Sequence, residues 1–370
     1  MRLVLVFSRW MSLGRWDELG MFERETALYR RLSAMGVQVS FLTWGAGAEL
    51  DFAARLPGIS ILCNRFNLPT KHYERLAPLL HARHLWQADA IKTNQASAAT
   101  IAQPAAKLWR RPLIARMGFM ASEFAARDFG DGSPEYRTEI MREDTLFSAA
   151  RAIVVTTPTM ADNVANRHPD AQNRIRVIPN YVDTELFAPL PSVEKLYDVV
   201  FIGRLTAQKN IPVLLEALEI SGSRALIVGS GPLENLVISA STNSQGMISW
   251  LPSLPNEQLP RAIAEADMFV LPSLWEGHPK TLIEAMSAGA AVIGADSPGI
   301  NGVIKPETTG LLCPANASGL AQAISRLKTQ PLLRKELGER ARQFACESWS
   351  LERILQLELA LIKEFAGTSP

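Results

Sequence analysis

The 370-residue sequence predicts an α/β fold with two doubly wound parallel-sheet domains in tandem. The first observation is that short apolar runs alternate with amphipathic helical stretches, which is typical of βαβ units. The second is a change around 186–198, where two prolines and the loss of any clear period predict a linker. The third is that the alternation resumes after this linker, so a second domain of the same kind is expected.

The first domain, predicted to span 1–188, contains seven apolar runs of strand length. They lie near 2–7, 37–43, 59–63, 90–93, 112–117, 152–155 and 175–178. The segment 21–35 has apolar residues at helical spacing and ends before Gly36, so it is predicted to be a helix. The run at 2–7 is better explained as a strand than as a signal peptide, because no longer hydrophobic region or cleavage site follows it.

The second domain, predicted to span 189–349, contains five more such runs. They lie near 198–203, 224–229, 246–250, 268–271 and 290–295. Ligands of doubly wound sheets bind outside the carboxyl ends of the strands, so the loops after these strands are expected to hold the site. The remaining segment, 350–370, holds a strongly apolar helix near 350–366, which must pack on another part of the protein.

The composition argues against several classes of protein. There are 38 basic and 37 acidic residues, a net charge of +1 that gives no reason to expect a nucleic-acid partner. The three cysteines are too few and too scattered for a disulfide framework or a zinc site, so a reducing cytoplasm is the expected location. No stretch approaches the ~18 apolar residues of a membrane span, so any membrane contact is expected to be peripheral.

The segment from Glu276 to Glu284 carries two carboxylates around a predicted helix start. His278 suits the N-cap, Pro279 the first helical position and Gly289 the position just after the helix. Glu276 therefore lies in the loop before the helix, and Glu284 lies inside it. The free backbone N–H groups between them favour an anion such as phosphate.

The expected distance between these carboxylates limits their chemistry. Carboxylates that act on one glycosidic bond stand about 5–9.5 Å apart. Five helical residues span about 7.5 Å, and three extended residues add up to roughly 10 Å. The two glutamates are therefore predicted to contact different parts of one long ligand, for example a sugar and a ribose joined by a diphosphate. Taken alone, the segment is better explained as two surface glutamates beside a capped helix.

A second strand, loop and helix carries two cations. Gly203 and Arg204 come at the end of the strand near 198–203, and Lys209 lies in the loop before a helix whose first turn holds Pro212. Arginine offers a planar fork for phosphate oxygens and lysine a mobile charge, so this loop suits a diphosphate. Taken alone, it is better explained as a solvated loop with two cations.

A glycine-rich turn, Gly229-Ser-Gly231-Pro232, follows the strand near 224–229. Its glycines would let the backbone approach a ligand closely. The signal is weak, because the dinucleotide-binding pattern G-x-G-x-x-G is absent.

These motifs occur in an order that closely resembles the retaining glycosyltransferases of family four, which have the GT-B fold. The resemblance is strong over 150–350 and weaker over 1–150. It is carried by Ile-Pro-Asn-Tyr-Val-Asp-Thr-Glu-Leu-Phe (178–187), Phe-Ile-Gly-Arg-Leu-Thr-Ala-Gln-Lys-Asn (201–210), Leu-Pro-Ser-Leu-Trp-Glu-Gly-His-Pro-Lys-Thr-Leu-Ile-Glu-Ala-Met (271–286) and Thr-Gly-Leu-Leu-Cys-Pro (309–314). It implies two Rossmann-like domains facing a cleft, with the C-terminal helix crossing back to the first domain.

The resemblance also implies a role for each site residue. Arg204 and Lys209 would hold the donor diphosphate, Glu276 would lie by the donor sugar, and these three would be catalytic. Glu284 would accept hydrogen bonds from the ribose. The implied donor-binding residues are Gly203, Arg204, Lys209, Gly229, Gly231, Glu276, Gly277, His278, Pro279, Lys280, Thr281, Leu282 and Glu284. The cations supply the electrostatic stabilisation, so no metal or cofactor is expected.

Members of this family usually retain the anomeric configuration. The implied mechanism is attack by the acceptor hydroxyl on the face that the diphosphate is leaving, through an oxocarbenium-like state. A phosphate oxygen of the leaving group would take the proton. No protein nucleophile is then required.

The first domain departs from the family pattern. Met117 stands where many members have a histidine near the donor sugar, so that role is not carried over. Arg116 is a candidate for contact with phosphate or acceptor, although a salt bridge is the simpler explanation. Gly20 keeps the close approach of a glycine-rich turn that is otherwise reduced here.

Two segments that mix basic residues with tryptophan bear on the acceptor. They are 81–86, His-Ala-Arg-His-Leu-Trp, and 107–111, Lys-Leu-Trp-Arg-Arg. Such groups suit the headgroup region of an anionic membrane. The hypothesis is peripheral contact with the membrane and a glycan or lipid-linked acceptor handled at its cytoplasmic face; solvated helix faces with half-buried tryptophans are the alternative.

The predicted function is transfer of a hexose from a UDP- or GDP-sugar to a glycan or lipid-linked acceptor, in the synthesis of a bacterial surface polysaccharide or glycolipid. Two alternatives stay open. One is a sugar-nucleotide epimerase or hydrolase on the same scaffold, and the other is a non-catalytic relative that binds nucleotide sugar or glycan.

Overall fold

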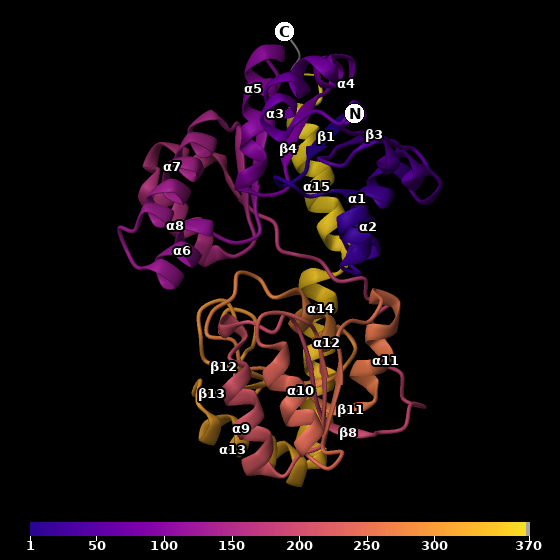
Figure 1. Cartoon of the computed structure of the whole chain (residues 1–370), viewed down its shortest axis with the longest axis vertical. Coiled ribbons are helices and arrows are strands. Elements are labelled where there is room, and N and C mark those ends of the chain that lie inside the picture. Colours follow the sequence, from indigo (N-terminus) through magenta and orange to yellow (C-terminus); the bar gives the residue numbers. More distant parts are fainter. Residues whose placement is uncertain (368–370) are drawn as a thin grey trace. The chain divides into compact units, whose positions relative to one another are not determined.

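The computed structural model describes residues 1–367, which form two compact units (Figure 1). Unit 1 consists of Met1–Pro179 together with the chain from Leu355 onward, and unit 2 is Asn180–Ile354. The sequence predicts domain boundaries at 188/189 and 349/350, whereas contacts divide the chain at 179/180 and 354/355. No helix among the described residues is both long and apolar enough to cross a membrane.

Unit 1 is built on a seven-stranded parallel sheet with the strand order β3-β2-β1-β4-β5-β6-β7. All seven strands match runs predicted from the sequence. Their bounds are β1 Arg2–Val6, β2 Gln38–Leu42, β3 Ile59–Leu62, β4 Ala90–Thr93, β5 Leu113–Met117, β6 Ala152–Val155 and β7 Ile175–Val177. Strands β4 and β6 are buried at every position, which explains why they read as continuous apolar runs.

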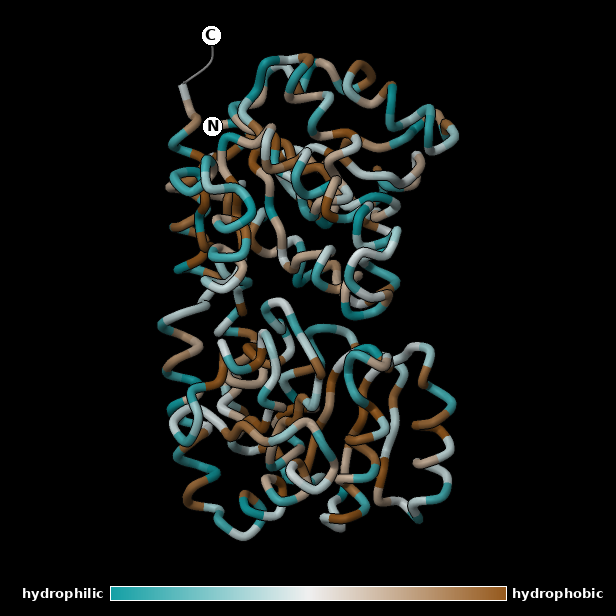
Figure 2. Tube along the Cα trace, turned by 90° about the vertical axis from the view of Figure 1, so that its left-hand side faces the viewer, coloured by the Kyte–Doolittle hydropathy of each residue, from teal (hydrophilic) through white to brown (hydrophobic). Residues whose placement is uncertain are grey.

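Helices cover this sheet, and the predicted helix over 21–35 is α2. The α-helices that precede β7 in the chain are α1 Leu13–Glu18, α2 Phe22–Ala34, α3 Thr70–Leu80, α4 Ala82–Gln87, α5 Ala99–Trp109, α6 Ala121–Phe129, α7 Pro134–Ala149 and α8 Pro158–Arg167. The 3-10 helices in the same part of the chain are η1 Gly47–Arg55, η2 Ala96–Ala98 and η3 Pro169–Arg174. Figure 2 shows hydrophobic segments inside each unit and hydrophilic ones mainly on its outer helices and loops.

Unit 2 is built on a six-stranded parallel sheet with the order β10-β9-β8-β11-β12-β13. The strands are β8 Tyr197–Ile202, β9 Ala225–Val228, β10 Ile248–Leu251, β11 Ala266–Leu271, β12 Ala291–Ala295 and β13 Leu311–Cys313. The helices are α9 Ile211–Ser221, α10 Glu234–Asn243, α11 Leu259–Ala264, α12 Lys280–Ser287, α13 Ala317–Thr329 and α14 Pro331–Trp349, with η4 Ala207–Lys209 and η5 Asn256–Gln258. Strand β13 was not predicted, because its three residues are too few to show a period.

The predicted C-terminal helix is α15, Leu351–Phe365, and its residues from Leu355 onward belong to unit 1. Inside unit 1, Glu358 of α15 accepts hydrogen bonds from Lys92 Nζ of β4 at 2.5 and 2.6 Å. Both side chains are almost fully buried, at 1% and 3% exposed for Lys92 and Glu358. The doubly wound fold and the return of the last helix to the first domain are therefore confirmed.

The structure corrects the surface assignment of His81. This residue is buried, and its Nε2 lies 3.0 Å from the hydroxyl of Tyr73, so it cannot belong to a headgroup-binding surface. Burial, with a smaller effect of nearby His84 and Arg65, lowers the pKa of His81 to about 4.

This lowered pKa predicts a loss of stability in mild acid. In the unfolded chain His81 has a pKa of about 6.5, so below that pH it binds a proton that it does not bind in the folded protein. The free energy of unfolding should therefore fall between about pH 6.5 and 4, by up to roughly 3 kcal/mol. Urea unfolding at several pH values should show this decline, and it should be smaller in His81→Asn. A variant with the same pH dependence as the parent protein would contradict the assignment.

Candidate functional site

Two predicted catalytic residues meet in unit 2. Lys209 Nζ donates to Glu276 Oε1 at 2.5 Å, and the two side chains are only 11% and 9% exposed. Lys209 ends η4 in the loop after β8, and Glu276 lies in the loop after β11. Because β8 and β11 are neighbours in a parallel sheet, their carboxyl ends open onto the same edge. The sequence predicts both residues at one site, but it does not predict this direct ion pair.

Gln208 holds the two loops together, a role that was not predicted. Its side-chain Nε2 donates to the carbonyl of Trp275 at 2.7 Å, and its own carbonyl accepts from the N–H of Leu274 at 2.8 Å. The residues next along the chain, Lys209 and Glu276, form the ion pair. The one sequence signal for this role is that Gln208 adjoins Lys209, which is too little to distinguish it from any other loop residue.

The loop after β12 supports Glu276 from the other side. The N–H of Glu276 donates to the carbonyl of Pro298 at 2.8 Å. Gly299 has φ +85, and a Cβ there would stand 2.2 Å from the carbonyl oxygen of Glu276. A side chain at position 299 would therefore push this loop away from Glu276, so glycine is needed for the approach.

The glycine-rich turn after β9 packs against the loop that carries Arg204. Gly229 and Gly231 have φ +153 and +151, and a Cβ at either position would meet the carbonyl oxygen of Gly203 at 1.8 Å or of Leu205 at 2.6 Å. The N–H of Leu205 also donates to the carbonyl of Ser230 at 2.8 Å. In unit 2 these glycines admit the neighbouring backbone and so fix the loop that carries Arg204, while the close approach of a ligand stays a prediction.

Arg204 itself is exposed, and no ion pair or side-chain hydrogen bond is recorded for it within residues 1–367. It differs in this respect from Lys209, whose ammonium group already has a carboxylate partner. The site thus combines an exposed cation with a nearly buried one that is bound to a carboxylate.

The segment 276–284 has the predicted form with one shift. Glu276 precedes α12 and Glu284 lies within it, 2% exposed, and Gly289 follows the helix with φ +77. The N-cap is Pro279, not His278 as predicted, and its φ of −72 with extended ψ places it outside the first turn. The residues after it, Lys280, Thr281 and Leu282, form the first turn of the helix, the part of any helix whose backbone N–H groups point toward a ligand and not along the intrahelical ladder.

Other residues of this segment are placed by packing. His278 is buried with its ring edge-on to Trp349 at 5.4 Å, and its carbonyl accepts from Asn180 Nδ2 at 2.7 Å. Leu282 is fully buried in the core of unit 2, so only its backbone can serve a ligand. Asn180 lies in one of the segments that carry the family resemblance, but its bond to the loop before α12 was not predicted.

The predicted acceptor-side residues, Gly20 and Arg116, both lie in unit 1. Gly20, with φ +65, follows the end of α1, and its N–H donates to the carbonyl of Asp17 at 2.9 Å, so it has a helix-ending role. Arg116 lies on β5, and its Nη1 donates to the carbonyl of Asn94 at 3.2 Å. Met117 is fully buried in the core of unit 1, where it cannot stand in for a histidine at a ligand.

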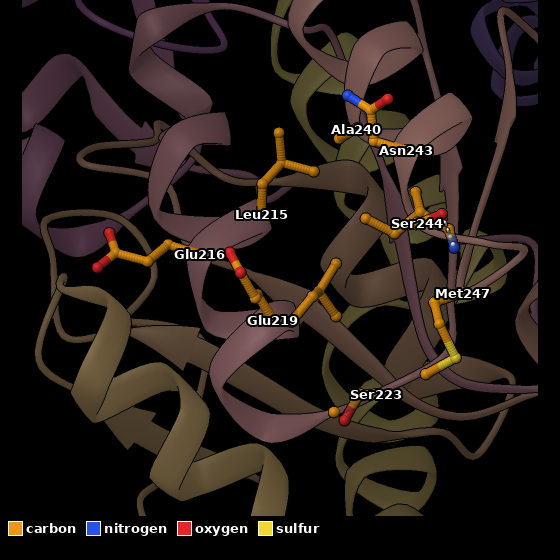
Figure 3. Close-up of a pocket in the computed structure, with 11 residues that line it drawn as sticks. Leu215, Glu216, Glu219, Ser223, Ala240, Asn243, Ser244 and Met247 are labelled. Atoms are coloured by element: carbon orange, nitrogen blue, oxygen red, sulfur yellow. Dashed lines mark hydrogen bonds between the residues drawn. The ribbon is translucent and has the colours of Figure 1, made fainter.

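A cavity of about 480 Å³ lies elsewhere in unit 2, between α9 and α10 (Figure 3). Its lining includes Glu216 and Glu219 of α9, together with Ser223 and Met247, which come just before β9 and β10. It is therefore at the amino ends of these strands, opposite the edge that holds Lys209 and Glu276. None of the predicted donor-binding residues lines it.

Comparison with known proteins identifies the family. Residues 26–186 match the family model "Glycosyltransferase Family 4", and residues 182–344 match "Glycosyl transferases group 1". The D-inositol 3-phosphate glycosyltransferase of Salinispora arenicola (strain CNS-205) is 24% identical over 91% of this chain and 85% of its own length. The UDP-Gal:alpha-D-GlcNAc-diphosphoundecaprenol alpha-1,3-galactosyltransferase of Escherichia coli is 34% identical over 39% of this chain and 42% of its own.

Among solved structures, sucrose-phosphate synthase from Thermosynechococcus elongatus superposes with a TM-score of 0.83 at 20% identity, covering 100% of both chains. The two parallel-sheet units and the returning α15 thus have a counterpart in a known fold. With its two halves matched by successive family models and its motifs gathered at one sheet edge, the chain is a glycosyltransferase of family four with the GT-B fold.

Proposed function

We propose that this enzyme transfers a hexose from a UDP- or GDP-sugar to a glycan or lipid-linked acceptor with retention of anomeric configuration. The observation that carries the proposal is the Lys209–Glu276 pair at the carboxyl edge of the unit 2 sheet, 2.5 Å apart and nearly buried. A fixed cation and a fixed carboxylate side by side suit a donor whose diphosphate is anionic and whose sugar offers hydroxyl groups.

The donor diphosphate is proposed to lie beside Lys209 and Arg204, at the first turn of α12. Arg204 is exposed and can reach two phosphate oxygens, and the first turn of α12 adds the positive end of the helix dipole. These groups stabilise charge on the departing nucleotide, so we propose that the reaction needs neither a metal nor a cofactor.

Glu276 is proposed to orient the donor sugar. Its carboxylate, which accepts from Lys209 Nζ, has further lone pairs that can accept hydrogen bonds from sugar hydroxyls. Glu284 is proposed to bind the ribose, because it lies inside α12, one turn beyond the residues proposed to bind the diphosphate. The acceptor hydroxyl then attacks on the face that the diphosphate leaves, and a phosphate oxygen takes its proton.

The acceptor is proposed to be lipid-linked, in the synthesis of a bacterial surface polysaccharide or glycolipid at the inner face of the cytoplasmic membrane. The support is the Escherichia coli relative, whose name gives UDP-Gal as donor and a diphosphoundecaprenol-linked sugar as acceptor. That relative shares the higher identity over a part of the chain only, so the sugar it transfers is not proposed here.

A thermal-shift screen tests the donor. One of the UDP-, GDP-, ADP- and dTDP-sugars should raise the melting temperature above the others, because a ligand at 100 times its Kd stabilises by about 2.7 kcal/mol. The same donor should be hydrolysed slowly without acceptor, and NMR of the first-formed sugar should show the donor's anomeric configuration. Epimerised nucleotide sugar would instead support the epimerase alternative, and binding of a nucleotide sugar without any turnover would support the non-catalytic relative.

Gln208→Ala should lower kcat/KM by about tenfold. The change removes the hydrogen bond to the Trp275 carbonyl, worth about 0.5–1.5 kcal/mol, and loosens the loops that carry Lys209 and Glu276. Steady-state transfer with the donor found above measures the loss. Gln322→Ala, at an exposed position of α13, is the matched control and should leave transfer unchanged. Equal activity of the two variants would remove Gln208 from the machinery.

A further inference from the structure

We propose that the outer face of α3, α4 and α5 docks unit 1 on an anionic lipid surface. The inference deepens the proposed function and rests on it, because it names the place at which a lipid-linked acceptor would be met. It starts from five large apolar side chains that are exposed: Leu76, Leu79, Leu80, Trp86 and Leu108, at 40%, 58%, 36%, 56% and 51%.

These side chains belong to helices that pack on the same side of the unit 1 sheet. Tyr73 and Ala77 of α3, Leu85 of α4, and Ile101 and Ala105 of α5 share one hydrophobic cluster with alternate residues of β1 and β5. Alternate strand residues point to one face of a sheet, so the opposite stripes of these helices all face outward on one side. Figure 1 shows the three helices together in unit 1.

A hydrogen bond joins the ends of α5 and α3. The indole Nε1 of Trp109 donates to the carbonyl of Pro78 at 2.8 Å, which holds Leu108 close to the last turn of α3, where Leu79 and Leu80 are exposed. Trp109 is thus a structural residue and not a membrane anchor, contrary to the hypothesis from the sequence. The exposed tryptophan of this face is Trp86.

Exposed cations lie on the same three helices or directly after them. They are Lys71, Arg75, Arg83, Lys107 and Arg110, all exposed, and no ion pair or side-chain hydrogen bond is recorded for them in the described part of the chain. Between 70 and 112 the acidic residues are Glu74 and Asp89. Glu74 is paired with Arg9 at 2.6 Å. Asp89, which accepts from the backbone N–H of Arg2 at 2.8 Å, is then the one acidic residue of this range without an ion pair among the described residues, so the five cations outnumber it.

The charges on this face indicate which kind of partner it binds. An apolar strip edged by unpaired lysines and arginines fits a bilayer interface, where Leu and Trp enter the headgroup boundary and the cations meet anionic lipids. The surface of another copy of this chain would bring like charges together. The site in unit 2 uses none of these residues.

Flotation of the full-length protein with vesicles tests the proposal without donor or acceptor. The protein should float with phosphatidylcholine–phosphatidylglycerol vesicles at low salt, weakly at high salt, and little with phosphatidylcholine alone. Arg83→Gln/Lys107→Gln should lower the partition coefficient about 30-fold, since each cation near the surface contributes about 1 kcal/mol. Leu79→Ser/Trp86→Ser should abolish the binding that survives high salt.

The matched control is Arg224→Gln/Lys335→Gln, which removes the same charge from exposed positions of unit 2 and should float like the parent protein. Circular dichroism melting should be unchanged in all these variants, because the altered side chains are exposed. The proposal is overturned if the parent protein stays unbound at low salt, if neutral vesicles bind it equally, or if Arg83→Gln/Lys107→Gln floats normally. Because no turnover is measured, such a result would not bear on donor binding or transfer, which have their own assays.

Discussion

Arg204→Ala should lower kcat/KM for sugar transfer by about 30- to 1000-fold, which corresponds to about 2–4 kcal/mol of transition-state stabilisation. The reason is that Arg204 is an exposed cation at the carboxyl edge of the unit 2 sheet, held in place by the turn at Gly229 and Gly231. Removing an exposed side chain should leave the melting temperature unchanged, so the loss would be one of catalysis. Arg224→Ala, which removes an exposed arginine of the same unit, should be almost fully active.

Lys209→Ala should lose transfer to a similar degree, but it should also lower stability. The substitution leaves the carboxylate of Glu276, 9% exposed, without its cation. Lys209→Ala/Glu276→Ala should recover the stability and not the activity. Near-normal transfer by either Arg204→Ala or Lys209→Ala would overturn the assignment of the donor site.

Glu358→Gln should lower the free energy of unfolding by about 3–5 kcal/mol at neutral pH, the largest effect on stability that we expect. Lys92 is fully buried and would keep a charge with no carboxylate partner. Burial already lowers the pKa of Lys92, with Glu358 acting in the opposite direction. Without Glu358 this pKa falls further, so folded Lys92 loses its proton sooner as the pH rises. The difference in the free energy of unfolding between the parent protein and Glu358→Gln should therefore become smaller as the pH rises toward about 10.4, the pKa of lysine in the unfolded chain.

Two further variants control this experiment, which is read by urea unfolding with separate probes for each unit. Glu364→Gln removes an exposed carboxylate from the same helix, paired with Arg176 at 3.2 Å, and should cost less than about 1 kcal/mol. Lys92→Met/Glu358→Leu replaces the pair by apolar side chains and should recover most of the stability. If Glu358→Gln proved as stable as Glu364→Gln, the buried pair would not support unit 1.

The sequence was sufficient for the sheets because buried parallel strands are continuous apolar runs. Strand β13 was not predicted, because its three residues between Gly310 and Pro314 are too few to show a hydrophobic period. The site was predicted to the level of its loops: Lys209 and Glu276 each follow a strand, and neighbouring parallel strands end at one edge. The hydrogen bond between Lys209 and Glu276 could not be predicted, because the sequence of each strand does not show that β8 lies beside β11 in the sheet.

Single residues that act through backbone contacts were the hardest to predict. Gly229 and Gly231 were predicted to let a ligand approach, but their contact with the backbone of Gly203 and Leu205 was not predicted, because the sequence does not show which backbone a glycine lies against. Gln208 and Asn180 bond to carbonyl groups 67 and 98 positions away, and any loop could hold such residues. His81 and Trp109 were assigned to a surface by their polarity, although their polar atoms bond to Tyr73 and Pro78.

The Lys92–Glu358 pair also bears on the order in which the chain folds as it is made. The two residues are 266 positions apart, and all of unit 2 is synthesised between them. On the ribosome unit 2 can therefore be completed while β4 still holds an ammonium group with no counter-ion. Unit 1 should become fully stable only after α15 has emerged, which makes its completion a late, long-range step.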